Sequence, residues 1–142
     1  MFNPSRDQAR RFFIDSWRKY RQRELLTQME HLAVDIVLAH PEYHALLGDE
    51  ERALAHDYAP ESGELNPFLH LSLHLAVEEQ LAIDQPPGLR PAFNLLLGRK
   101  AERHDALHAV LECLGETVWR AQREGTPPDG EAYLECVRSR AK

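Results

Sequence analysis

Long apolar runs are missing from this sequence. No run approaches the roughly 18 to 20 residues that a membrane-spanning helix needs. Residues 1–13 contain an early proline and an aspartate but no small-residue cleavage site. These absences predict a cytoplasmic protein without membrane association. With 43% hydrophobic residues, the 142-residue chain is expected to bury its core as a single helical domain, 1–142.

Cysteine is scarce, and its placement excludes several kinds of site. Cys113 and Cys136 are the only two, and they have neither CxxC nor CxxCH spacing. A disulfide framework, a thiolate zinc site and attached haem are therefore not indicated, and two buried free thiols are expected. A glycine-rich phosphate loop and an HExxH motif are also absent from the sequence.

Basic residues are fewer than acidic ones, which gives a formal net charge of -6. A nucleic-acid partner needs a basic face that releases counterions, so no nucleic acid is expected. A small molecule or a protein is the remaining class of partner, and the oligomeric state stays open. The exception is a basic segment between residues 6 and 23, which we expect to be a solvated helix face. Its members are Arg6, Arg10, Arg11, Arg18, Lys19, Arg21 and Arg23.

Alternating strand patterns are also missing, and helical patterns fill the chain. Capping boxes are indicated at Ser5 with Gln8 and at Thr27 with Glu30. Asn66 followed by Pro67 predicts the start of the most apolar helix. We therefore predict an all-α bundle of five to six helices with no sheet. The main helical segments are expected from 5 to about 20, from 28 to about 40, and over 67–84, 100–123 and 131–138, with short helices over 41–47 and 90–97.

Histidine is the one residue in clear excess, with eight in the chain. Random placement gives roughly 0.4 pairs four residues apart, a spacing that puts two side chains on one helix face. The chain has three such pairs, which favours a common cause. They are His40 with His44, His70 with His74, and His104 with His108.

The last two pairs continue into the pattern HxxxHxxxE, which suggests a metal site. Imidazoles in a run as apolar as 68–81 need a partner, and neutral imidazole is the commonest protein ligand for transition metals. We expect an ion, iron first and zinc second, to be held by paired histidines, with carboxylates or His44 completing the shell. The candidate ligands are His70, His74, His104, His108, Glu112, Glu78 and His44.

Other residues receive lesser roles in this interpretation. Glu79, Glu116 and Asp35 are alternatives that would orient the ligands from outside or pack between helices. Pro41 makes His40 a helix cap rather than a ligand. The remaining histidines, His31 and His56, are expected to be incidental.

A rival interpretation stays open beside the metal site. The chain would then be a non-catalytic helical module that binds another protein, with structural histidines bonded to backbone carbonyls or acids. No residue pattern names a reaction, so whether the protein is an enzyme is left undecided.

Four segments carry a resemblance to a known family: HPEYHALL, NPFLHLSLHLAVEEQLAIDQPPG, HAVLECLGETVWRAQR and PPDGEAYL. Through them nearly the whole chain resembles a bacterial family known as domain of unknown function 1841. The resemblance implies a small soluble bacterial protein and no particular activity. More distantly, histidines and carboxylates on bundled helices are similar to those of hemerythrin and DinB-like metal-binding bundles. The order of ligands differs from that of hemerythrin, so only the style of site is implied.

Overall fold

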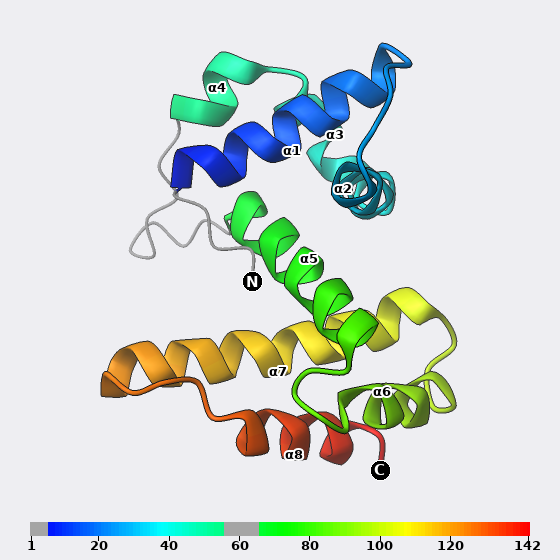
Figure 1. Cartoon of the computed structure of the whole chain (residues 1–142), viewed down its shortest axis with the longest axis vertical. Coiled ribbons are helices and arrows are strands. Elements are labelled where there is room, and N and C mark those ends of the chain that lie inside the picture. The colour runs from blue at the N-terminus through cyan, green and yellow to red at the C-terminus, as the bar shows by residue number, and fades with distance from the viewer. Residues whose placement is uncertain (1–5, 56–65) are drawn as a thin grey trace. The chain divides into compact units, whose positions relative to one another are not determined.

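The computed structural model describes residues 6–55 and 66–142, and all regular structure in these ranges is helical (Figure 1). The all-α prediction is therefore confirmed for the described residues. Eight α-helices and one 3-10 turn replace the expected five to six helices, because the short segments form separate turns. The elements are α1 Arg6–Arg21, α2 Gln28–Leu38, η1 Pro41–Tyr43, α3 His44–Leu47, α4 Glu50–Ala55, α5 Pro67–Ile83, α6 Leu89–Leu97, α7 Arg103–Glu124 and α8 Gly130–Arg140.

Contacts divide the chain into two compact units, Met1–Leu75 and Ala76–Lys142. The boundary falls within α5, whose first half belongs to the first unit and whose second half belongs to the second. That the chain is a single domain stays a prediction. No helix among the described residues has both the length and the apolarity needed to cross a membrane.

In the first unit, α2, α3 and α4 gather around α1 (Figure 1). Phe13 and Trp17 of α1 meet Val37 of α2 and Leu47 of α3 in one apolar cluster. Leu71 from the first half of α5 is also fully buried there. Apolar residues recur at helical spacing along one face of these helices. Burial of that face stabilises the unit.

Two of the predicted helix starts are confirmed. Thr27 and Glu30 form the capping box, since the Glu30 N–H donates to the Thr27 hydroxyl and the Thr27 N–H donates to the Glu30 carboxylate at 2.8 Å. Asn66 accepts hydrogen bonds from the backbone N–H groups of Phe68 and Leu69 at the start of α5. The box predicted at Ser5 lies outside the described residues.

The basic segment is not wholly a solvated face, because Arg10 is 2% exposed. Its Nη1 donates to the carbonyl of Ala53 at 2.9 Å, and its guanidinium carbon lies 5.1 Å from the centroid of the Phe68 ring. A buried cation must be satisfied in this way to offset its desolvation. Arg10 therefore joins α1 to α4 and α5, whereas Arg18 and Arg21 are exposed as predicted.

In the second unit, α6, α7 and α8 pack against one another, and α8 returns along α7 (Figure 1). Leu89 and Leu96 of α6, Val110 of α7 and Val137 of α8 are fully buried. The hydroxyl of the buried Tyr133 donates to the Gln80 side chain on α5 at 2.7 Å. Burial raises the pKa of Tyr133 far above its ordinary value, so the hydroxyl keeps its proton and can donate at neutral pH.

A disulfide joins Cys113 of α7 to Cys136 of α8, so the expectation of two free thiols was wrong. The two residues are 23 apart in sequence, and their Cα atoms are 5.7 Å apart. The two cysteines are close because α8 packs back along α7. The number of residues between them does not predict this contact.

We expect Glu30 to make the stability of the first unit dependent on pH. The Lys19 side chain, which donates at 2.8 Å, and then the Thr27 N–H lower the pKa of Glu30 below its ordinary value of 4.5. Stability from this depressed pKa is present above pH 4.5 and is lost as the pH falls through the lower folded value. Glu30→Gln should therefore reduce the free energy of unfolding at pH 7 by about 1 kcal/mol, and the deficit should shrink in acid.

Denaturant unfolding curves of the wild type and of Glu30→Gln, recorded from neutral to acidic pH, would measure this difference. Glu24→Gln is the matched control, because Glu24 also pairs with a cation, Arg18, but in an exposed position. A Glu30→Gln deficit that is the same in acid as at pH 7 would contradict the assignment.

Reduction of the disulfide should destabilise the second unit. Closing a loop of this length restricts the unfolded chain, which corresponds to about 3 kcal/mol in the chain-entropy model. Melting with and without a phosphine reductant would measure the change, and a double variant with both cysteines replaced by serine should not respond. Equal melting of the oxidised and reduced wild type would show that the cross-link contributes nothing.

Candidate metal centre

Three histidine rings converge in the first unit. His70 and His74 lie one turn apart on α5, and their ring centroids are 4.9 Å apart. His40, just after α2, places its ring 5.0 Å from that of His70 and 4.6 Å from that of His74. Each pair of rings packs edge to face.

A backbone hydrogen bond fixes the orientation of His40. Its Nδ1 lies 2.7 Å from the carbonyl oxygen of Ile36. A carbonyl can only accept, so Nδ1 carries the proton and a neutral ring presents an unprotonated Nε2. That Nε2 lies 3.2 Å from Nε2 of His70. In the absence of a metal, His70 therefore donates to His40.

The three rings are held inside the protein. His40 is 3% exposed and His74 is 2% exposed, while His70 is half-buried. Each ring offers one nitrogen, and these nitrogens lie within 4.8 Å of one another. Buried neutral imidazoles at such distances form the kind of ligand set that zinc, copper, nickel or iron accepts.

Tyr43 of η1 borders the cluster. Its ring stacks on His40 at a centroid distance of 5.6 Å and meets His70 edge to face at 6.1 Å. Burial, with a smaller contribution from the charge of Glu42, raises the pKa of Tyr43 above its ordinary value of 10.0. Tyr43 therefore stays a neutral phenol beside the imidazoles.

His44, the predicted ligand of this region, is engaged elsewhere. Its Nε2 lies 2.8 Å from the carbonyl of Val37, and its ring lies 4.5 Å from the Trp17 indole. The membership of His44 in a metal site stays a prediction. His40 does occupy the N-cap position of η1, as Pro41 indicated, but its side chain makes no capping hydrogen bond.

The predicted carboxylates are occupied by arginines. Glu78 accepts two hydrogen bonds from Arg103, at 2.9 and 3.3 Å. Glu112 pairs with Arg140 at 2.6 Å in an exposed position. Both pairs lie in the second unit. The oxygen ligands expected from the HxxxHxxxE pattern therefore already have cationic partners.

The other histidine pair, His104 and His108, lies on α7 in the second unit. The two rings are neighbours, with centroids 4.1 Å apart, and both residues are half-buried. Their membership in a metal site stays a prediction. Among the lesser candidates, Glu116 pairs with Arg120 at 2.9 Å, and Asp35 and His31 are exposed. His56 lies outside the described residues.

His40 is the member of the cluster that sequence reasoning set aside. The available signal was its place in the first HxxxH pair, but α2 ends at Leu38 and η1 starts at Pro41. The helical spacing of four therefore does not put His40 and His44 on one face, and the chain directs the two rings to different partners.

The comparisons with known proteins identify a family and no activity. Residues 5–139 match the model of a family described as Domain of unknown function (DUF1841). No curated protein and no solved structure matches the chain. The more distant similarity to hemerythrin and DinB-like bundles is thus without support.

Proposed function

Since this chain belongs to the DUF1841 family, which has no assigned activity, we propose its function from the site alone: it binds a divalent transition metal ion through His40, His70 and His74. The proposal is limited to binding, because no residue pattern in the chain names a reaction.

The observation that carries the proposal is the 3.2 Å separation of the His40 and His70 Nε2 atoms. Zinc binds imidazole nitrogen at about 2.0 to 2.1 Å, so two ligands of a tetrahedral ion lie about 3.3 to 3.4 Å apart. The pair needs to open by only a few tenths of an ångström to accept an ion, and His70 would move its proton from Nε2 to Nδ1.

The hydrogen bond from His40 to Ile36 supports the same conclusion. Histidines that bind metals usually donate their second ring N–H to a carbonyl or a carboxylate, which fixes the tautomer and increases the basicity of the ligand. The contact at 2.7 Å supplies this support without a metal being present. Purely structural histidines would satisfy their rings equally well, so the experiment must separate the two roles.

Zinc is the ion we propose, ahead of iron. Many histidines with a few carboxylates suit either ion, and a set of two histidines and one carboxylate is typical of non-haem iron. Glu78 and Glu112 are instead held by Arg103 and Arg140. An all-imidazole set with tetrahedral spacing suits zinc better.

Three imidazoles would leave the fourth position of a tetrahedral zinc ion for water, whereas a fourth protein ligand would close the site. The recurrence of HxxxH at His104 and His108 stays a prediction from the sequence alone. The occupant of the fourth position thus separates a structural site from one able to activate water.

The central test measures metal content and stability together. Protein purified without a histidine tag should contain one zinc ion per chain, and His74→Ala should lose it. Zinc should raise the wild-type melting temperature, because an ion bound only by the folded state adds about 2.7 kcal/mol at one hundred times its dissociation constant.

Two histidines outside the cluster provide controls. His31→Ala, on the exposed side of α2, should leave metal content and melting unchanged. His44→Ala should lower the melting temperature through its lost Val37 and Trp17 contacts but should retain the zinc response. If zinc and chelator leave all these melting curves unmoved, the histidines are structural and the proposal fails.

A second prediction concerns the fourth position. If His40, His70 and His74 hold the ion and water fills the open position, His104→Ala and His108→Ala should each leave the zinc affinity unchanged. Competition with a chromogenic chelator measures both affinities. A loss of tenfold or more in either variant, equivalent to about 1.4 kcal/mol, would contradict a site of three protein ligands.

A further inference from the structure

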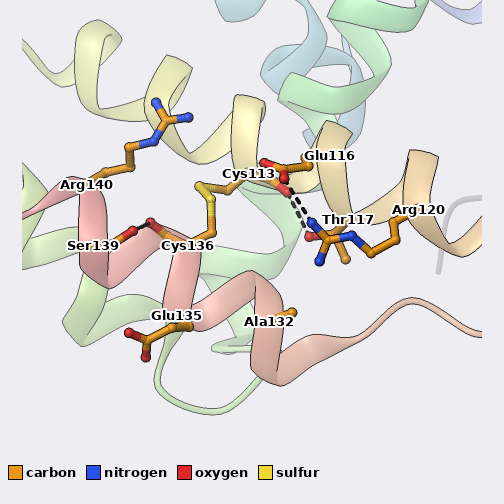
Figure 2. Close-up of a pocket in the computed structure, with 9 residues that line it drawn as sticks. All are labelled: Cys113, Glu116, Thr117, Arg120, Ala132, Glu135, Cys136, Ser139 and Arg140. Atoms are coloured by element: carbon orange, nitrogen blue, oxygen red, sulfur yellow. Dashed lines mark hydrogen bonds and ion pairs between the residues drawn. A yellow bond between two sulfur atoms is a disulfide. The ribbon is translucent and has the colours of Figure 1, made fainter.

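A pocket of about 440 Å³ in the second unit has the disulfide in its wall. Figure 2 shows Cys113 and Cys136 in the centre of this pocket, between α7 and α8. Small-molecule sites begin at about 300 Å³. The cross-link is therefore reachable from a cavity large enough for a small ligand, which a purely structural disulfide does not require.

The two sulfur-bearing residues differ in access. Cys113 is 0% exposed in the middle of α7, whereas Cys136 is half-buried near the carboxyl end of α8. Exchange of a disulfide starts by in-line attack on one sulfur, and the accessible sulfur is the one attacked. The geometry therefore favours attack at Cys136 with Cys113 as the leaving group.

Charged groups stand on both sides of the disulfide. Arg120 and Arg140 lie on opposite sides of it in Figure 2, and Glu135 lies on the same wall as Cys136. Arg120 pairs with Glu116 and Arg140 pairs with Glu112, in both cases through exposed side chains. Exposed pairs of this kind are weak, so a ligand carboxylate can replace the protein carboxylate.

We propose that Cys136 is a site of reversible thiolation by a low-mass peptide thiol that carries a carboxylate at each end. The thiol sulfur would reach Cys136, the carboxylates would meet Arg120 and Arg140, and an ammonium group would meet Glu135. This inference concerns residues of the second unit and does not rest on the proposed metal site.

The exchange balances without an external oxidant. The ligand thiolate attacks Sγ of Cys136, the bond between the two cysteine sulfurs breaks, and its electron pair leaves on Sγ of Cys113, which takes a proton. The product is a mixed disulfide on Cys136. Attack by the Cys113 thiolate on Cys136 reverses the step, while a second ligand thiol releases the oxidised ligand and leaves both cysteines reduced.

Opening the cross-link does not require α8 to leave its place. Tyr133, Leu134 and Val137 of α8 are buried, and Tyr133 donates a hydrogen bond to Gln80. These contacts are independent of the disulfide, so the reduced and thiolated forms are expected to stay folded.

Single-cysteine variants test the site, with glutathione disulfide as the probe. Cys113→Ser, which keeps Cys136, should gain one glutathionyl group per chain in the folded state, as read by intact mass. The matched variant Cys136→Ser should remain unmodified until urea exposes Cys113. Equal modification of both folded variants, or none of Cys113→Ser except in urea, overturns the proposal.

The wild type provides a measurement that does not depend on a variant folding. In a buffer of glutathione and its disulfide, acid quenching followed by peptide mapping should find the mixed disulfide at Cys136. Finding it only at Cys113, or only after denaturant is added, overturns the proposal.

A third measurement tests the ligand class. Folded Cys113→Ser should react several-fold faster with glutathione disulfide than with neutral hydroxyethyl disulfide, and adding Arg120→Gln should reduce that ratio. If both probes react at the same rate in Cys113→Ser, the carboxylate-bearing ligand is wrong.

Discussion

The hydrogen bond from His40 to the carbonyl of Ile36 is the interaction on which the histidine cluster depends. It uses the Ile36 carbonyl near the end of α2, which also accepts from the backbone N–H of Ala39 at 3.1 Å. The same bond fixes the tautomer of His40, and this decides that His70 donates across the 3.2 Å contact. The hydrogen bond near the end of α2 therefore orients the buried His40 ring toward α5.

Local rules predicted the helices well, because their signals are carried by neighbouring residues. The Thr27 and Glu30 capping box and the Asn66 cap appear at the predicted positions, since each needs only residues three apart or fewer. The α5 histidine pair is also correctly placed on one face, because both residues lie within a single helix. The helix count was low because a helix as short as α4 carries weak periodicity, and because the short helix predicted over 41–47 divides into η1 and α3.

The errors share a different origin, since each depends on contacts between elements. Arg10 is buried because α4 supplies a carbonyl and α5 supplies an aromatic ring, neither of which is near it in sequence. Cys113 meets Cys136 only because α8 returns along α7. The rings of His40 and His44 contact different partners because η1 redirects the chain between them. Residues four apart share a face only where both lie in one continuous helix.

Charge balance limits how the proposed centre could hold an ion. A divalent ion bound by neutral imidazoles would bring two positive charges into a buried site, where desolvation is costly. None of His40, His70 and His74 would supply a negative charge, so compensation would come from the remaining ligand, a water that a bound zinc ion would make acidic enough to lose its proton near neutral pH. A site with three histidines would thus favour hydroxide or another anion as its remaining ligand.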